Sequence, residues 1–262
     1  MSTNEVNYHN VTDFPGKKLT KKERRDQRRN QQNHLDIRYI NPKTENQCKA
    51  FDYFEDGFNL SFLGYPGTGK SFVSLYLSLS EIQSSNIHSV TIIRSVVPSR
   101  DIGFLPGSEK EKSRVYEAPY AAICNELYGR GDAYEILKQK GIIKFETTSF
   151  LRSVTMNDTI VIVDECQNMN EGELHTVITR LGENSRIIFA GDTGQDDLTY
   201  KKGENSGLAK FQRILDRMKS FRTVHFEAND IVRSGLVKEY ILTKAKLENK
   251  DNETLSTKSD ST

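Results

Sequence analysis

The segment Gly64–Ser71 has the composition and spacing of a phosphate-binding loop, Gly-Tyr-Pro-Gly-Thr-Gly-Lys-Ser. It lies between an apolar run and a helical pattern, which is the context that this motif requires. Gly67 and Gly69 allow the backbone N–H groups to turn inward around phosphates, and the start of the following helix adds partial positive charge. The alternative, a glycine-rich turn that binds nothing, is disfavoured because the motif is complete and in context.

Lys70 and Ser71 close this loop and carry its chemistry. We expect Lys70 to reach the β- and γ-phosphates of a nucleotide, and Ser71 to ligate Mg²⁺. The residues predicted to bind the nucleotide are Gln47, Gly64, Pro66, Gly67, Thr68, Gly69, Lys70 and Ser71.

Two acidic residues, Asp164 and Glu165, follow the apolar run Thr159–Val163. A carboxylate in this position holds Mg²⁺ in many phosphate-loop proteins, so Asp164 is the second predicted metal ligand. Glu165 beside it is well placed to deprotonate a water aimed at the γ-phosphate, which favours hydrolysis over transfer to a small molecule. The alternative is a pair of acids that start a helix and bind no metal.

Two glutamines are weaker candidates. Gln195 ends the sequence Gly-Asp-Thr-Gly-Gln after another apolar run, where it could contact a γ-phosphate or its attacking water. Gln47 precedes a helical stretch and could read an adenine edge, since an amide both donates and accepts. Taken alone, the first pattern is also ordinary turn chemistry, and the second is more often a helix cap with a solvated side chain.

The elements that position these residues alternate between strands and helices. Runs such as Thr159–Val163 and Arg186–Ala190 are continuously apolar, which indicates strands buried on both faces of a parallel sheet between helix layers. The fold prediction is therefore a doubly wound α/β domain, with its site at the carboxyl ends of the strands. Other predicted strands are 59–63, 90–93, 142–145 and 223–226, and predicted helices are 71–82, 118–128, 170–181, 208–219 and 236–246.

Composition removes several classes of protein. The chain has 262 residues, 35% hydrophobic and 28% charged, and a net charge of only +1, so it can bury a core but its charge predicts no partner. The sequence contains no apolar run of about 18 residues, so we expect no membrane span, and we expect no signal peptide at the N-terminus. Cys48, Cys124 and Cys166 fit neither a disulfide framework nor a zinc site, and they suit a reducing cytoplasm.

Both ends of the chain are polar. Residues 1–33 carry a basic cluster between Lys17 and Arg29, so we expect a disordered basic arm there. Residues 248–262 are expected to form a loose polar tail, which leaves 34–247 as one domain. The composition of the tails is phage-like, in which case the compartment would be the host cytoplasm.

Taken in order, the motifs resemble those of the PhoH family of P-loop ATPases, which are related to the first RecA-like domain of superfamily 1 helicases. The resemblance spans about 40–246 and omits both tails. The segments that carry it are TENQ at 44–47, GYPGTGKS at 64–71, IIRSVVPSRDIGFLPGSEKEK at 92–112, IVDECQN at 162–168, GDTGQDDL at 191–198, SGL at 206–208 and VHFEANDIVRSGLV at 224–237.

The resemblance implies specific roles. It implies a RecA-like fold, ATP and Mg²⁺ as cofactors, Gln47 at the adenine, and Glu165 as catalytic base. It also implies that Gln195 senses the γ-phosphate and that Arg233 is a phosphate-sensing or finger arginine, acting in its own subunit or in the next one. Arg94 is expected to face the nucleotide or a nucleic acid. The predicted catalytic residues are therefore Lys70, Glu165, Gln195 and Arg233.

The chain is expected to lack the second RecA-like domain that closes over the nucleotide in such helicases. The resemblance and this expectation together predict a homo-oligomeric ring, with a hexamer as the expected form. The first functional hypothesis is an ATPase coupled to nucleic acid, with RNA favoured over single-stranded DNA, by translocation or unwinding. The second is an ATP-driven remodelling protein that acts on protein partners, and a small-molecule kinase is disfavoured by Glu165. The basic arm could bind nucleic acid or merely be solvated.

Overall fold

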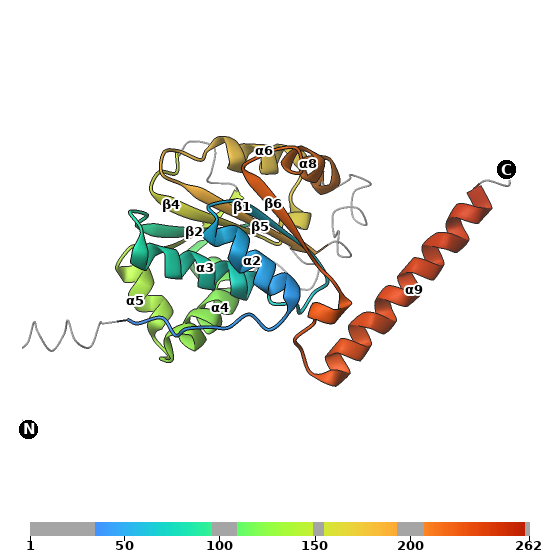
Figure 1. Cartoon of the computed structure of the whole chain (residues 1–262), viewed down its shortest axis with the longest axis horizontal. Helices are drawn as coiled ribbons and strands as arrows, with labels where there is room; N and C mark the ends of the chain where they lie inside the picture. The colour runs from blue at the N-terminus through green and yellow to red at the C-terminus, as the bar shows by residue number, and fades with distance from the viewer. Residues whose placement is uncertain (1–34, 96–108, 149–154, 193–206, 260–262) are drawn as a thin grey trace, which may run out of the picture. The chain divides into compact units, whose positions relative to one another are not determined.

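The computed structural model describes residues 35–95, 109–148, 155–192 and 207–259 (Figure 1). Gln195, most of the GFLPG-containing segment and the basic arm therefore lie outside the described residues. The chain divides into two units, Met1–Asp36 and Ile37–Thr262, and nearly all the described residues belong to the second. No helix in the described ranges combines the length and hydropathy needed to cross a bilayer.

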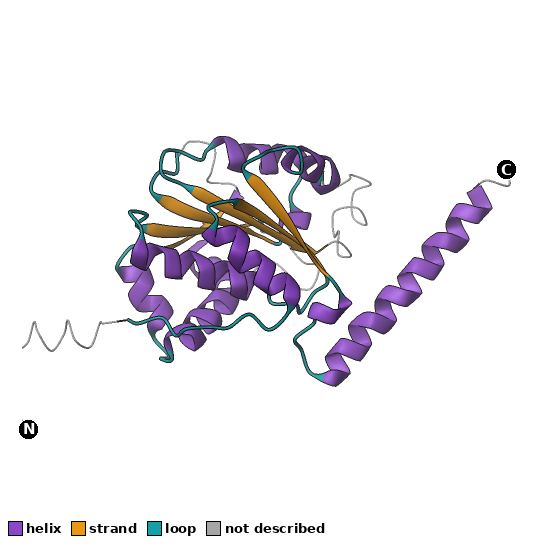
Figure 2. Ribbon diagram, viewed as in Figure 1, coloured by secondary structure: helices purple, strands orange, loops and turns teal. Residues whose placement is uncertain are grey.

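The second unit is built on a six-stranded sheet of order β3-β2-β4-β5-β1-β6, and every registered strand pair is parallel. Helices cover both of its faces (Figure 2). The predicted architecture is confirmed: this is an α/β domain with a parallel sheet between helix layers, and the phosphate loop joins β1 to α3. The strands are β1 (Asn59–Gly64), β2 (Ser89–Arg94), β3 (Ile143–Thr147), β4 (Thr159–Asp164), β5 (Arg186–Asp192) and β6 (Phe221–Phe226).

Two groups of helices form the outer layers. Helices α2, α3, α4 and α5 lie on one face of the sheet, whereas α6 and α8 lie on the other (Figure 1). The bounds are α2 (Glu45–Glu55), α3 (Lys70–Ser84), α4 (Glu109–Tyr128), α5 (Ala133–Gln139), α6 (Glu171–Thr179), α8 (Leu208–Leu215) and α9 (Gly235–Ser259), with single 3₁₀ turns η2 (Cys166–Asn168) and η3 (Ala228–Asp230).

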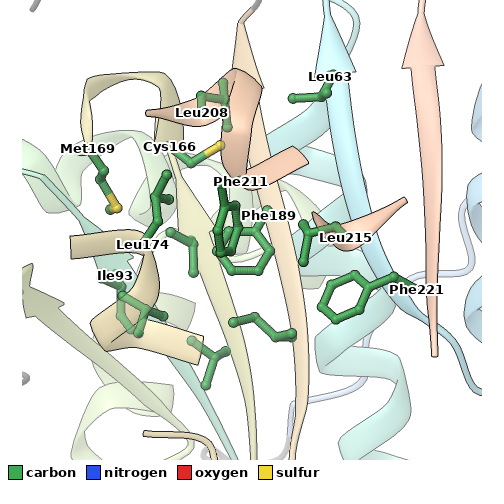
Figure 3. Packing of buried hydrophobic residues seen from close by; sticks show 14 of the residues in the cluster. Leu63, Ile93, Cys166, Met169, Leu174, Phe189, Leu208, Phe211, Leu215 and Phe221 are labelled. Atoms are coloured by element: carbon green, nitrogen blue, oxygen red, sulfur yellow. The ribbon is translucent and has the colours of Figure 1, made fainter. Parts of the chain in front are cut away.

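The core between the sheet and α6 and α8 explains why the strands are apolar throughout. Phe189 of β5 faces this layer (Figure 3), and Val161 and Val163 of β4 belong to the same buried cluster. Leu174 of α6 and Phe211 of α8 pack into the same cluster. The intervening residues of the central strands are buried as well, so β4 is covered on both faces. Rigid strands of this kind fix the positions of the residues at their carboxyl ends.

The helices depart most from the predictions at α4, α5 and α9. Helix α4 begins at Glu109, before the expected start at Ala118, and it continues through Pro119. Helix α5 was not predicted, because its seven residues are too few to show a clear period. The expected loose tail is wrong as far as Ser259: α9 has no proline and no glycine after Gly235, so no residue there breaks it.

Candidate functional site

Strand register brings the predicted residues to one edge of the sheet. Gly64 at the end of β1 lies opposite Asp192 at the end of β5. Asp164 at the end of β4 lies opposite Arg94 at the end of β2. Because all these strands are parallel, their carboxyl ends form a continuous edge, and a cleft of about 680 Å³ opens there.

The phosphate loop needs glycine where the sequence has it. Gly64 has a φ of +133°, and a Cβ there would lie 1.9 Å from the carbonyl oxygen of Phe226. Gly67 and Gly69 also have positive φ, and Gly69 precedes the first turn of α3. Thr68 is buried and donates its hydroxyl to the Tyr65 carbonyl, which holds the loop in its turn. Pro66, Gly67 and Gly69 line the cleft, as predicted for the phosphate site.

Lys70 is buried at the base of this loop. Its ammonium donates to the carbonyl oxygens of Gly64 at 3.1 Å and Tyr65 at 2.7 Å. It also forms an ion pair with Asp192, with 2.5 Å between the two groups. Burial raises the pKa of Asp192, although Lys70 acts in the opposite direction. Phosphate oxygens entering the loop would therefore compete with Asp192 for the charge of Lys70.

The two predicted metal ligands are adjacent. The Ser71 hydroxyl lies 3.0 Å from both carboxylate oxygens of Asp164. Burial raises the pKa of Asp164, and the neighbouring Glu165 raises it further, while hydrogen bonds and Arg94 partly oppose this. No basic group in the described part of the chain forms an ion pair with Asp164.

These residues fit Mg²⁺. A buried carboxylate without a paired cation, next to a hydroxyl, supplies the hard oxygen ligands that this ion prefers. No cluster of three or more His, Cys, Asp or Glu that could hold a metal occurs among the described residues. Two protein oxygens are nevertheless enough where nucleotide phosphates and water complete the shell, as is usual for Mg²⁺.

Glu165 is held in an unusual backbone conformation. Its φ is +53°, which is rare for a residue other than glycine and is frequent at functional sites. Gln167 donates its amide to the Glu165 carboxylate at 2.6 Å and accepts from the backbone N–H of Asp192 at 3.0 Å. Arg94 approaches the other oxygen of Glu165 at 3.9 Å.

Sequence reasoning gave no role to Gln167, although it lies in the DECQN segment. In the structure it joins the end of β4 to the end of β5. The sequence shows that Gln167 lies two residues after Glu165. This spacing indicates a role only once the structure places the end of β5 beside Gln167.

Gln47 lies in the cleft wall with its amide already engaged. Its carbonyl oxygen accepts from the N–H of Lys43 at 2.8 Å, and its nitrogen donates to the Thr68 carbonyl at 3.0 Å. Gln47 therefore ties the segment before α2 to the phosphate loop. One lone pair and one N–H of a primary amide remain beyond these two bonds, enough to contact a base edge.

The cleft also has an aromatic wall and an arginine. Phe51 and Tyr76 stack with ring centroids 5.4 Å apart, and both line the cleft. Arg233 packs beside the phosphate loop of its own chain, since a Cβ on Gly67 would lie 2.9 Å from its Cγ. The preceding residue, Val232, donates its N–H to the Gly67 carbonyl at 3.1 Å. Of the predicted site residues, Gln195 lies outside the described residues, and Gly64 and Thr68 belong to the loop without being among the residues that line the cleft; the others line it.

The family model of PhoH-like proteins matches residues 39–244, which span the sheet, the phosphate loop and the start of α9. The chain belongs to the PhoH-like family. A PhoH-like protein of Bacillus subtilis is 32% identical over 180 residues, covering 68% of this chain and 56% of that protein. The protein PhoH of Escherichia coli is 30% identical over 175 residues, covering 66% of this chain and 49% of that protein. The chain thus spans about half the length of these PhoH relatives.

Solved structures match the chain at low sequence identity and with TM-scores below 0.5. The large terminase of a thermophilic bacteriophage matches with a TM-score of 0.47 and 13% identity, covering 76% of this chain and 50% of that one. The SWI2/SNF2 ATPase core of Sulfolobus solfataricus, solved in complex with dsDNA, matches with a TM-score of 0.42 and 16% identity, covering 73% and 46%. At these values the likeness carries no information about activity.

Proposed function

We propose that this PhoH-like protein binds ATP with Mg²⁺ and hydrolyses it. The observation that carries the proposal is that a single cleft is lined by the start of α3, with Lys70 and Ser71, and by the end of β4, with Asp164 and the following Glu165. No other reaction class uses this combination as directly, because it provides a phosphate clamp, a metal site and a base together.

Each residue has a distinct part in the reaction. Lys70 and the loop N–H groups bind the β- and γ-phosphates, while Ser71 and Asp164 hold Mg²⁺. The metal, when bound, neutralises charge that develops on the transferred phosphoryl group. Glu165 accepts a proton from the attacking water as the bond from water oxygen to the γ-phosphorus forms and the bond to ADP breaks. Gln167 holds the Glu165 carboxylate for that step.

Replacing the base separates binding from hydrolysis. Glu165→Gln keeps the shape of the side chain but cannot accept the proton, so ATP affinity should be retained while turnover falls by about 100-fold or more. Glu135→Gln, an exposed acid on α5, is the matched control and should hydrolyse ATP normally. Normal turnover by the Glu165 variant would show that the base assignment is wrong.

We further propose that hydrolysis is coupled to nucleic acid, RNA in preference to single-stranded DNA. The helicase-like order of the motifs supports this, and so does the basic cluster in residues 1–33. The ATPase rate should rise with RNA, and deletion of 1–33 should weaken binding and flatten its salt dependence, because fewer counterions are released. A rate that ignores RNA and DNA but rises with a protein partner would instead favour the remodelling function.

We also propose that the chain assembles in the cytoplasm into a ring of identical subunits, with a hexamer as the expected form. Leu236 and Tyr240 at the start of α9 are 78% and 67% exposed, and they lie close in sequence to Arg233, which packs beside the phosphate loop. A neighbouring subunit that covers these apolar side chains would also cover the cleft. Sedimentation of the purified chain tests this, and a monomer with full ATPase at every concentration would contradict it.

The position of Arg233 bears on how such a ring would work. Because it packs beside Gly67 of its own chain, we propose that it acts in its own subunit. Mixed rings of Arg233→Ala and Glu165→Gln subunits should then recover no activity beyond that of the separate variants. Recovery on mixing would place the arginine across the subunit interface.

A further inference from the structure

Tyr120 is a buried residue of α4 that the proposed reaction has not yet used. It is 1% exposed, and its ring lies 5.9 Å from that of Phe145 on β3. Its hydroxyl donates to the Oδ2 atom of Asp164 at 2.8 Å. Tyr120 is 44 residues from Asp164 in the sequence, so this contact exists only because the fold brings Tyr120 of α4 to the end of β4.

The donors around Asp164 are not equivalent. Ser71 lies at the same distance, 3.0 Å, from Oδ1 and Oδ2, and so does not distinguish the two oxygens. Of these two oxygens Tyr120 binds only Oδ2, and it therefore fixes the rotation of the carboxylate group; its hydroxyl also contacts Arg94. Oδ1 does not share this donor, and it lies 3.0 Å from the Ser71 hydroxyl, which is the other predicted metal ligand.

The difference between the Ser71 and Tyr120 hydrogen bonds to Asp164 becomes more important when Mg²⁺ binds. A serine hydroxyl that ligates Mg²⁺ directs its oxygen lone pairs at the metal and can no longer serve the carboxylate in the same way. Tyr120 is then the side-chain hydroxyl, among the described residues, that still holds Asp164. Donors behind a metal ligand commonly set its orientation, and their removal typically lowers metal affinity by about 10- to 100-fold.

We propose that Tyr120 is a positioning residue that orients Asp164 for Mg²⁺ when ATP is bound. The inference rests on the proposed function, since it assumes that Mg²⁺ and nucleotide share this cleft. It adds a residue of α4 to a metal site otherwise made by α3 and β4. Pro119 and Ile123 of the same helix line the cleft, so α4 forms a wall of the site as well as its support.

The experiment measures binding rather than turnover. A fluorescent, non-hydrolysable ATP analogue is titrated into the full chain in EDTA and then at increasing concentrations of MgCl₂. Tyr120→Phe keeps the ring and its packing but removes the donor. We expect it to bind the analogue normally in EDTA and to need about tenfold more Mg²⁺ for half of the metal-dependent gain in affinity.

Tyr134 provides a matched control. It is 2% exposed and donates its hydroxyl at 2.8 Å to another buried carboxylate, Glu117, away from the cleft. Tyr134→Phe should therefore leave the Mg²⁺ requirement unchanged. An equal shift in both variants would mean that each simply loosens α4, and the inference would be wrong.

Two further outcomes decide the matter. In an Asp164→Ala background, removal of the Tyr120 hydroxyl should have no additional effect on the Mg²⁺ requirement, because the residue acts through that carboxylate. An unchanged requirement in Tyr120→Phe, or weaker binding already in EDTA, would overturn the inference while leaving the proposed function intact. A wild-type chain that binds no nucleotide, or whose binding ignores Mg²⁺, would overturn both.

Discussion

Two buried carboxylates in this molecule have nearly the same surroundings but different partners. Asp164 is 5% exposed and Glu117 is 6% exposed, and each accepts a tyrosine hydroxyl at 2.8 Å. Glu117 also forms an ion pair with Lys138 of α5. Asp164 forms no ion pair with any residue that the structure describes; the Ser71 hydroxyl is its second hydrogen-bond partner, and Arg94 acts on it only from beyond ion-pair distance.

The difference separates a structural site from a functional one. A buried charge is costly unless a counter-charge and hydrogen bonds compensate it, and Lys138 provides the counter-charge for Glu117. At Asp164 burial raises the pKa and the nearby Glu165 raises it further, and the hydrogen bonds and the more distant Arg94 offset this only in part. Retaining such a group costs stability, and that cost is understandable if the compensating cation arrives with the substrate.

The largest expected effect is a difference in nucleotide affinity between variants of Lys70, in the cleft, and of Lys138, beside Glu117. Lys70→Ala removes the cation that contacts phosphate, so nucleotide affinity should fall by about 100-fold, or about 3 kcal/mol. Lys138→Ala should leave affinity unchanged and lower the free energy of unfolding by about 1 kcal/mol, because Glu117 loses its partner. Isothermal titration calorimetry and urea unfolding measure the two quantities. Equal losses of affinity would remove the distinction between the two regions.

A second test compares the carboxylates directly. Asp164→Asn removes a buried charge that has no ion-pair partner among the described residues, so the free energy of unfolding without nucleotide and Mg²⁺ should rise by about 1 kcal/mol. Glu117→Gln removes a compensated one, and the same quantity should fall by about 1 kcal/mol. Urea unfolding at neutral pH gives both values. Destabilisation by Asp164→Asn would mean that its hydrogen bonds outweigh the charge, contrary to the comparison.

The sequence predicts the edge of the sheet better than it predicts the walls of the cleft. Strands buried on both faces are apolar throughout, and short polar motifs with fixed spacing follow them. A short stretch of sequence is therefore enough to predict β1 and β4 and the site residues at their ends. The pairing of β1 with β5 is not local, and neither is the resulting contact between Lys70 and Asp192. Gln167 shows the same limit, because one of its two contacts is to a different strand.

Helix α4 shows the limit most clearly. Tyr120 lies in a pattern that predicts an ordinary core residue, and the packing of its ring fits that interpretation. Its hydroxyl acquires a role only when α4 is placed beside β4. Pro119 adds to the difficulty, since a proline usually indicates the start of a helix, whereas this helix passes through it.

The smallest expected effect concerns a third buried carboxylate, Asp192, which does have a cation. Its partner is Lys70, 2.5 Å away, so the same lysine serves the protein before nucleotide binds and phosphate afterwards. Asp192→Asn should remove that competition and tighten ATP binding in EDTA about threefold, or about 0.7 kcal/mol. The gain is modest because Lys70 keeps its two carbonyl partners.

Asp132→Asn, in an exposed pair with Arg130, is the control and should leave the affinity unchanged. Measuring in EDTA separates competition for Lys70 from any effect of Asp192 on the metal. Weaker binding by Asp192→Asn under these conditions would show that the aspartate orients Lys70 toward phosphate, and that pairing within the cleft prepares the site for nucleotide.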